Sequence, residues 1–388
     1  MGTSGSRRLR TALLLPVPLL TSALLLAGCS SGGTDRPPAP SRAPTRAPAR
    51  AAACEVALPA AWRSAFATGE YRPPGGERAV LTDAGPGWTA LQLTGSEGLA
   101  GSGGRRAVLV RGGEPTPRTL LRFADPVEHQ LLAADFDGRR WAAFAVLEGR
   151  TLDSPWSLYV ADLTGGTTRR LARADRPGPL PRPVVHDGTV LWAQGTGAGK
   201  ATVFAAPAGG GPARTWHTGV LDTPFTTGGL LVWREADGDH TRPAAVSLRD
   251  GRPAALPPPI AALRDIRALV SDGTTWAWVA GETAPRLMVW RTGEARPTAA
   301  VTGSPAVDGM DQLRIAGRLV TWRTPETSYA LDLDSGAYAR ITPAYGYATA
   351  AGNALAVAFS LGNAKASGAR PVIQVVDAAR LPGLPHCG

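Results

Sequence analysis

Residues 187–192 read Asp-Gly-Thr-Val-Leu-Trp, a tight turn followed by an apolar strand that ends in tryptophan. The tryptophans that close such strands recur at steps of 41, 45 and 44 residues: Trp192, Trp233, Trp278 and Trp322. A second apolar strand follows each of them after a looser polar stretch. A period of about 40–50 residues with several short strands in each unit is typical of β-propeller blades.

Seven such units can be counted between about residue 77 and residue 380, with six or eight as alternatives because the first unit is the least regular. The 388 residues include 47 Gly and 35 Pro, and both residue types interrupt helices. The sequence therefore predicts an all-β fold, a β-propeller of four-stranded blades. The last unit shows no fourth strand after Asp377, and we expect a strand from the other end of the chain to complete it.

One blade carries a recognisable motif. Residues 158–171 read Leu-Tyr-Val-Ala-Asp-Leu-Thr-Gly-Gly-Thr-Thr-Arg-Arg-Leu, and residues 329–336 read Tyr-Ala-Leu-Asp-Leu-Asp-Ser-Gly, a second copy of the front half. This stretch resembles the blade motif of TolB-type propellers, which is itself similar to WD-repeat blades. That family usually has Ser-Pro-Asp-Gly at the preceding turn, of which this chain keeps Asp-Gly. The resemblance implies the fold of residues 77–380 and no particular partner.

The N-terminus has the features of an export signal. Arg7, Arg8 and Arg10 precede an apolar stretch at residues 11–26, which is shorter than the about 20 residues of a membrane span and contains two prolines. Residues 26–29 then read Leu-Ala-Gly-Cys, which resembles the lipobox of bacterial lipoproteins at all four positions.

The lipobox resemblance implies that residues 1–28 are a signal peptide and that Cys29 carries the lipid, diacylglycerol and palmitate. The protein would then be anchored in the cell membrane by this lipid, facing the extracytoplasmic side, or partly shed from it. A plain secretory signal with a chance cysteine is the alternative. The general and the twin-arginine export routes both stay open.

Residues 29–53 comprise the lipidated cysteine and a tether rich in Pro, Ala and Arg, without aromatic residues. Such a segment cannot bury enough apolar surface to fold, so we expect it to be disordered. The first 53 residues hold seven Arg and one Asp, which supply +6 of the formal net charge of +10. The rest of the chain lacks the clustered basic stripe that a phosphate backbone needs, so we expect no nucleic-acid partner.

The two cysteines left after lipidation bracket all the blades. Cys54 opens the folded region, and Cys387 is the penultimate residue. In an oxidising compartment thiol pairs persist as disulfides. We therefore predict a Cys54–Cys387 bridge that joins the two ends of a closed ring, with two independent buried thiols as the alternative.

Residues 54–76 are expected to form an N-terminal helical segment packed on the propeller, which spans residues 54–388 as one domain. Leu58, Trp62 and Phe66 fall on one helix face. Pro59 near the start and Gly69 beyond the end are typical helix boundary residues.

The eleven Trp could form a carbohydrate-binding platform, but a position that repeats in every blade is a core position. We therefore expect Trp192, Trp233, Trp278 and Trp322 in the core. Trp156 and Trp216 lie off this register and are the candidates for exposure.

Few residues suggest chemistry. The five His are scattered, and motifs of serine hydrolases, zinc peptidases and phosphate loops are absent. Residues 135–138 (Asp-Phe-Asp-Gly) and 237–239 (Asp-Gly-Asp) could begin calcium loops, but both lack the later Glu, and Asp-Gly is ordinary turn chemistry. We expect no catalytic residue, no metal site and no cofactor, with a site assembled from distant residues left open.

The connections that share one face of the propeller differ in length from those on the other. Long polar connections are expected on one face, at residues 94–104, 148–156, 173–182, 235–241, 302–311 and 360–369. Loops on a rigid scaffold concentrate recognition. The sequence favours a binding or scaffolding module that uses this face, which we call the long-loop face, with a protein or cell-envelope ligand as partner. The alternative is an extracytoplasmic hydrolase or lyase acting on a glycan or peptide in the central funnel.

Overall fold

The computed structural model describes residues 52–94, 105–112, 114, 116–124, 128–149, 151, 153–175, 178–197, 200–360 and 371–387. The chain divides into two units, Met1–Pro48 and Ala49–Gly388, and all described residues belong to the second. The predicted signal peptide, Cys29 and the predicted tether up to residue 51 lie outside the described residues.

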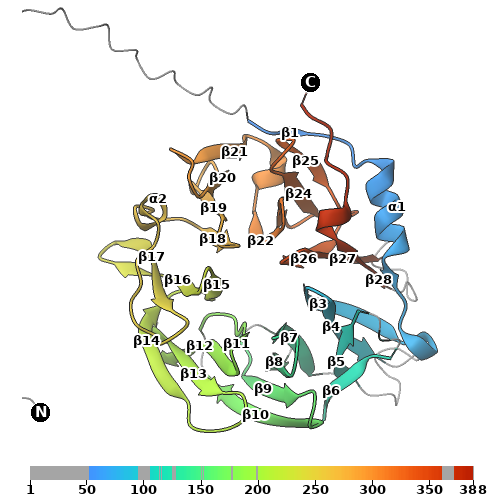
Figure 1. The fold of residues 1–388 in the computed structure, drawn as a ribbon, viewed down its shortest axis with the longest axis vertical. Coiled ribbons are helices and arrows are strands. Elements are labelled where there is room, and N and C mark those ends of the chain that lie inside the picture. The colour runs from blue at the N-terminus through green and yellow to red at the C-terminus, as the bar shows by residue number, and fades with distance from the viewer. Residues whose placement is uncertain are drawn as a thin grey trace, which may run out of the picture. The chain divides into compact units, whose positions relative to one another are not determined.

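Short antiparallel strands succeed one another around a ring (Figure 1). Blade one contains β3 (Arg78–Gly85), β4 (Trp88–Thr94), β5 (Arg106–Arg111) and β6 (Arg118–Arg122). Blade two contains β7 (His129–Phe136), β8 (Trp141–Glu148), β9 (Trp156–Asp162) and β10 (Thr167–Ala174). Blade three contains β11 (Val184–His186), β12 (Thr189–Gly197), β13 (Lys200–Pro207) and β14 (Arg214–Val220).

The second half of the ring continues the pattern. Blade four contains β15 (Phe225–Thr227), β16 (Leu230–Asp237) and β17 (His240–Ser247), followed by the short helix α2 (Pro258–Ala261). Blade five contains β18 (Ala268–Ser271), β19 (Thr275–Ala280), β20 (Arg286–Arg291) and β21 (Thr298–Thr302). Blade six contains β22 (Asp311–Ala316), β23 (Leu319–Arg323), β24 (Ser328–Asp332) and β25 (Ala337–Arg340). Blade seven contains β26 (Tyr347–Ala351), β27 (Ala354–Ser360) and β28 (Pro371–Asp377).

These strands confirm the predicted all-β propeller class. Blades three and four share one hydrogen-bonded sheet only because Val220 of β14 also pairs with Glu235 of β16. In every blade the first strand, which we call the inner strand, lines the centre of the ring. The channel is therefore walled by seven inner strands among the described residues.

The core lies between neighbouring blades. The four recurring tryptophans are buried as predicted, at 3%, 1%, 2% and 1% exposure: Trp192, Trp233, Trp278 and Trp322. Trp322 stacks on Tyr329 at 5.5 Å. The expectation for Trp156 is wrong, because this side chain is buried with the apolar cluster between blades two and three, whereas Trp216 is half-buried.

The N-terminal segment closes the ring, because it contains two short strands in addition to the expected helix. β1 (Cys54–Glu55) adds a parallel fifth strand to β25 of blade six. β2 (Glu70–Tyr71) pairs antiparallel with β28 and so becomes the fourth strand of blade seven. The last blade is therefore completed from the other end of the chain, as its missing strand predicted.

Between these two strands runs helix α1 (Ala60–Thr68), which lies on the outside of the ring beside β28 (Figure 1). Trp62 and Phe66 are buried against blades six and seven, as their helical spacing predicts. Gly69 ends the helix, and its N–H donates to the carbonyl of Ala65. The helix thus covers the seam where the chain's two ends meet.

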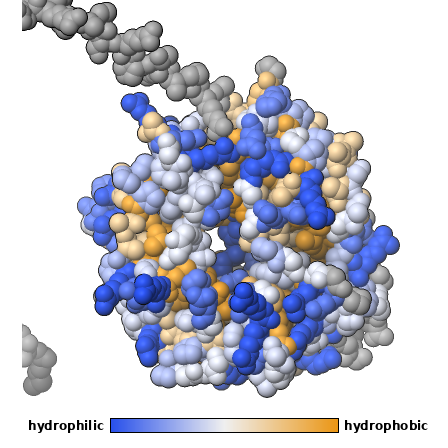
Figure 2. All heavy atoms as spheres, viewed as in Figure 1, coloured by the Kyte–Doolittle hydropathy of each residue, from blue (hydrophilic) through white to orange (hydrophobic). Residues whose placement is uncertain are grey.

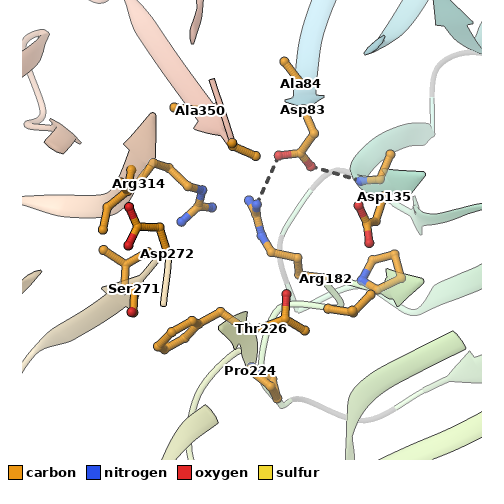
Figure 3. A pocket seen from close by; sticks show the side chains of 18 of the residues that line it. Asp83, Ala84, Asp135, Arg182, Pro224, Thr226, Ser271, Asp272, Arg314 and Ala350 are labelled. Carbon is orange, nitrogen blue, oxygen red and sulfur yellow. Dashed lines mark hydrogen bonds and ion pairs between the residues drawn. The ribbon is translucent and has the colours of Figure 1, made fainter. Parts of the chain in front are cut away.

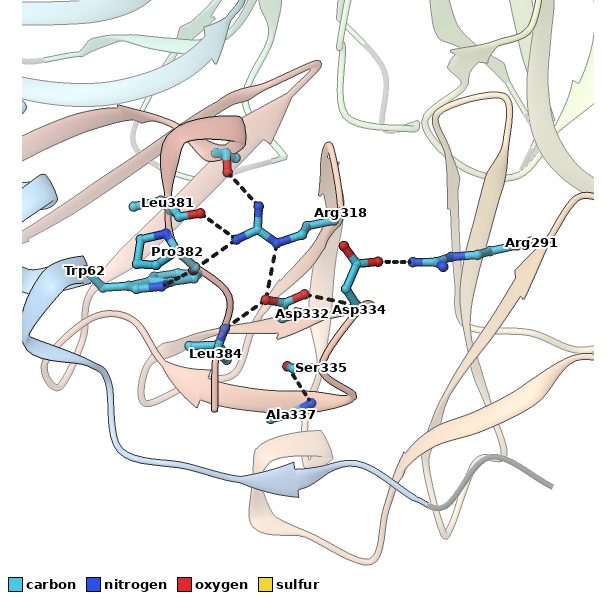
Figure 4. A network of polar contacts seen from close by, with 11 residues as sticks. Trp62, Arg291, Arg318, Asp332, Asp334, Ser335, Ala337, Leu381, Pro382 and Leu384 are labelled. Carbon is cyan, nitrogen blue, oxygen red and sulfur yellow. Dashed lines mark hydrogen bonds and ion pairs between the residues drawn. The ribbon is translucent and has the colours of Figure 1, made fainter. Parts of the chain in front are cut away.

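The C-terminal segment is held on the same seam by one ion pair (Figure 4). Nε of Arg318 lies 3.2 Å from the fully buried carboxylate of Asp332. The same guanidinium donates to the carbonyls of residues 378, 381 and 382, and Asp332 accepts the N–H of Leu384 at 2.9 Å. Trp62 adds a bond from its indole N–H to the carbonyl of Pro382 at 2.8 Å. The disulfide Cys54–Cys387, with Cα atoms 5.8 Å apart, joins the two ends at this seam.

The connections between strands alternate between short and long, as expected, in part of the ring. The turns after the inner strands are short, as at residues 86–87, 187–188 and 317–318. The expected long loop at residues 235–241 is wrong, because β16 and β17 extend through it and leave a two-residue turn, Gly238-Asp239. Residues 95–104 and 361–370 lie outside the described residues. No helix in the described part of the chain is long and apolar enough to cross a membrane.

Candidate ligand site in the central channel

Three charged side chains occupy equivalent places on the inner strands. Asp83 on β3, Asp135 on β7 and Arg314 on β22 each lie two residues before the pair that closes the first hairpin of their blade. Because side chains alternate along a strand, the three point to the same side of their strands, into the channel (Figure 3). The remaining inner strands carry uncharged residues at this place: Val184, Phe225, Val270 and Thr349.

A β-bulge precedes each of the three charged residues. β3, β7 and β22 each contain a register shift, whereas β11, β15, β18 and β26 pair regularly over their described lengths. In β22 the bulge includes Gln312, a residue with φ of 49°. Bulges re-aim side chains and are frequent next to functional sites. The inner strands that carry a charged residue at this place are thus the ones that contain a bulge, and those with an uncharged residue pair regularly.

These residues line a cavity of about 330 Å³ at the centre of the ring, visible as a hollow in Figure 2. Its charged or polar lining includes Asp83, Asp135, Arg182, Thr226, Ser271, Asp272 and Arg314 (Figure 3). Its apolar lining includes Trp88, Val184, Phe225, Val270 and Ile315. The cavity therefore combines a few charges with small and apolar walls.

Asp83 is buried and fully engaged. One carboxylate oxygen accepts the N–H of Ala134 from the next blade at 3.0 Å. The other accepts from Nη1 of Arg182 at 3.1 Å and from the hydroxyl of Thr349 at 3.4 Å. This carboxylate links three blades and neutralises Arg182, which lies in the connection before β11.

Asp135 plays the same linking role for the next pair of blades, because its carboxylate accepts the N–H of Val185 at 2.8 Å. Burial raises the pKa of Asp135 to about 6, and the negative charge of Asp83 adds to this rise. The hydrogen bonds from backbone N–H groups and the charge of Arg182 oppose it. Asp135 is consequently a carboxyl group that titrates near neutral pH.

Arg314 differs from Arg182 in having no carboxylate within ion-pair distance among the described residues. Nη1 of Arg314 donates to the carbonyl of Leu313 at 2.7 Å, and its guanidinium faces the cavity (Figure 3). Burial lowers the pKa of Arg314 to about 10, and the positive charge of Arg182 lowers it further. The side chain still carries its charge at neutral pH.

The hydroxyl group of Ser271 in the cavity lining is hydrogen-bonded to neighbouring groups. Ser271 accepts from Thr227 at 2.9 Å and from the N–H of Gly273 at 3.0 Å. None of the five His is among the residues that line the cavity. Three of them lie within ion-pair distance of carboxylates elsewhere: His186 of Asp187, His217 of Glu235 and His240 of Asp265.

The residues singled out from the sequence fall largely outside this cavity. Cys54 and Cys387 lie at the seam, and Cys29 lies outside the described residues. The calcium-loop candidate at residues 135–138 is split, because Asp135 faces the channel while Asp137 accepts three backbone N–H groups of its own turn. No group of three metal-ligating side chains occurs in the described part of the chain.

Some large apolar side chains stay exposed near the start of inner strands or just before them. Among the described residues these are Val80, Leu180, Leu221 and Tyr345. Val80 lies near the start of β3, and the other three lie in connections that lead into inner strands. Such connections share the long-loop face. Tyr345 is 79% exposed and holds a φ of 60°, a conformation that side chains other than glycine rarely adopt.

Comparisons with known proteins bear on the fold. No family model matches the sequence, and no curated protein matches it. Among solved structures, a prolyl endopeptidase superposes with a TM-score of 0.52 at 16% identity over 85% of this chain. The fold is a β-propeller. This chain spans 50% of that peptidase's length.

Two further structures are similar at lower scores. The propeller domain of the Trilobed protease from Pyrococcus furiosus has a TM-score of 0.47 at 12% identity, covering 72% of this chain and 91% of that one. TolB from Acinetobacter baumannii has a TM-score of 0.39 at 11% identity, covering 66% of this chain and 77% of that one.

Proposed function

We propose that this protein is an exported, lipid-anchored propeller that binds a ligand in its central channel and along the long-loop face. Cys29 would hold it to the membrane, and the tether would carry the propeller away from the surface. The observation that carries the binding function is the guanidinium of Arg314, which faces the cavity without a carboxylate partner.

A charged group in a partly dehydrated cavity favours a ligand of opposite charge. Arg182 cannot supply this attraction, because Asp83 already neutralises it. Arg314 is therefore the residue of the channel from which an anionic ligand would gain most.

The exposed apolar side chains support contact with a partner on the long-loop face. Leu180 and Leu221 lie in neighbouring connections that are tied together, since the hydroxyl of Thr223 donates to the carbonyl of Leu180 at 3.0 Å. Tyr345 is the most exposed of the four. Backbone strain at an exposed aromatic residue is more often found at functional positions than elsewhere.

Binding can be tested with the mature protein, residues 29–388, in detergent. A chemically varied panel of carboxylates, phosphates, sulfates and neutral sugars is titrated by calorimetry. We expect at least one anionic compound to bind wild-type protein and to lose affinity in Arg314→Gln. No binding by any anionic compound would contradict the proposal.

A second candidate function is hydrolysis or elimination on a glycan or peptide in the same channel. The observation that favours it is Asp135, whose pKa near 6 suits a general acid or base. Turnover of cell-envelope glycan fragments or peptides by wild-type protein, abolished in Asp135→Asn, would establish this function. Equal turnover by wild-type protein and the variant would contradict a role for Asp135.

A further inference from the structure

We propose that the channel takes an organic monocarboxylate with a small apolar body, and that Arg314 holds the carboxylate. This assignment rests on the proposed binding function and names the chemical class of its ligand. It follows from the guanidinium of Arg314 that lacks an ion-pair partner, from its free donors and from the apolar walls.

Of the two arginines that line the cavity, Arg314 is the one without a carboxylate at ion-pair distance among the described residues. Arg182 and Asp83 neutralise each other at 3.1 Å. One carboxylate oxygen of Asp272 is already engaged by the backbone and hydroxyl groups of its own turn. The remaining charged groups are Arg314, Asp135 and Asp311, the last at the start of the same bulged strand.

A ligand with two negative charges does not suit this balance. A phosphate dianion at Arg314 would place its second charge near Asp83 and Asp311, the two carboxylates whose charge acts on Arg314, and like charges repel more strongly in a poorly solvated cavity. A monoanion matches Arg314 without this excess. The carboxylate is the common organic monoanion at neutral pH.

The donors of Arg314 fit a carboxylate in shape as well. A guanidinium has five N–H donors arranged in a planar fork, and the structure gives Arg314 one protein acceptor, the carbonyl of Leu313. The other donors face the cavity. Two parallel N–H···O bonds from such a fork are the geometry in which arginine binds carboxylates.

The lining and volume of the cavity limit the size and polarity of the part of the ligand attached to the carboxylate. Trp88, Phe225, Val270 and Ile315 line the cavity together with alanines and prolines. Its volume of about 330 Å³ lies at the low end of small-molecule pockets, roughly 300–1,000 Å³. A small apolar body attached to the carboxylate, such as the C-terminal residue of a peptide or a short organic acid, meets these limits.

The test uses the mature full-length protein and calorimetric titration with four probes: benzoate, N-acetyl-alanyl-alanine, the C-terminal amide of that dipeptide, and inorganic phosphate. We expect a carboxylate probe to bind, and the amide to bind at least about 10-fold more weakly, because it lacks the charge. Benzoate and the dipeptide distinguish a free organic acid from a peptide C-terminus.

Variants assign the interaction to Arg314. Arg314→Gln should weaken carboxylate binding about 10–100-fold, and Arg314→Lys should retain part of it, because the charge stays while the fork is lost. Arg380→Gln is the matched control, since Arg380 is exposed and lies outside the cavity, and should leave affinity unchanged. The thermal midpoint of each variant shows whether it is folded.

Three results would overturn the assignment. Tighter binding of phosphate than of either carboxylate, lost in Arg314→Gln, would contradict the ligand class while the binding function stands. Carboxylate binding that Arg314→Gln leaves unchanged would contradict the site. Absence of binding by every anion would contradict both this assignment and the proposed function.

Discussion

Asp135 links two blades by a hydrogen bond, and its pKa is raised. Its carboxylate ties β7 to β11 through the N–H of Val185, as Asp83 ties β3 to β7 through Ala134. Asp83 has Arg182 as a partner, whereas Asp135 has no ion pair within the described residues. The difference explains why burial and the nearby charge of Asp83 raise the pKa of Asp135 to about 6.

The raised pKa predicts how stability depends on pH. Because the folded pKa lies above the ordinary value, the contribution of Asp135 is fully present below pH 3.8 and is lost as pH rises through about 6. The facing groups are Asp83, Arg182 and the N–H groups of Val185 and Phe136. We expect wild-type protein to lose about 2 kcal/mol on this account between about pH 4 and pH 7.

The control for this prediction is Asp135→Asn, which keeps an acceptor for Val185 and cannot ionise. Urea unfolding of both proteins across this pH range gives the difference directly, since all other titrating groups are shared. Parallel stability curves for wild-type protein and Asp135→Asn would show that Asp135 titrates normally.

The sequence contained part of the signal for this site. Asp83, Asp135 and Arg314 each stand three or four residues before the glycine of the following turn, where the other inner strands are uncharged. A charged residue in an apolar strand marks a departure from core packing. Arg182 carries no such signal, because it lies in an irregular connection and reaches Asp83 only in the folded ring.

At the scale of elements, the seam is held by segments that the repeat does not reveal. The period predicts the blades because each repeats the same buried strands. β1 and β2 have two residues each, too short for any periodic pattern. The C-terminal segment has no secondary structure beyond the turn at residues 378–380, and its position depends on Arg318 and Asp332.

The contribution of the Arg318–Asp332 pair to holding the C-terminal segment can be measured with a variant. Arg318→Ala would leave the carboxylate of Asp332 buried without its cation and would free three carbonyls of the C-terminal segment. We expect a loss of about 3 kcal/mol in the free energy of unfolding, since removing one partner of a buried pair leaves an uncompensated charge. Chemical denaturation of the folded domain measures it.

Arg380→Ala is the comparison, because Arg380 forms an exposed ion pair with Asp377 in the same part of the fold. Exposed pairs contribute little, so this variant should stay within about 0.5 kcal/mol of wild type. Equal losses in the two variants would mean that the C-terminal segment is not anchored through Arg318.

At the scale of the whole molecule, membrane anchoring through Cys29 and closure of the ring at the Cys54–Cys387 seam can be tested independently. The resemblance of residues 26–29 to a lipobox predicts that Cys29→Ala abolishes incorporation of labelled fatty acid. The precursor should then stay unprocessed in the membrane or the protein should appear in the medium. Metabolic labelling followed by fractionation measures this, and unchanged labelling in the variant would exclude Cys29 as the lipid site.

Ring closure depends on contacts that act together at the seam. β1 and β2 join the last two blades, α1 covers them, and Arg318 holds the C-terminal segment. The disulfide Cys54–Cys387 adds a covalent link across a sequence separation of 333 residues. In the loop-entropy model a ring of this size stabilises the fold by about 6 kcal/mol, and native bridges often contribute less. Because the non-covalent contacts remain without it, loss of the bridge should weaken the ring without opening it.

Cys387→Ser is therefore expected to fold and to melt several degrees below wild-type protein, as a loss of about 2–5 kcal/mol implies for a native bridge. A reductant should lower the melting temperature of wild-type protein to that of Cys387→Ser and leave the variant unchanged, because the variant has no bridge to reduce. Cys54→Ser should behave like Cys387→Ser, since either change removes the same bond. Peptide mapping without reductant should recover the two cysteines in one linked peptide. If both thiols are instead alkylated in oxidised, exported protein, the ring is closed by the non-covalent contacts of the seam alone.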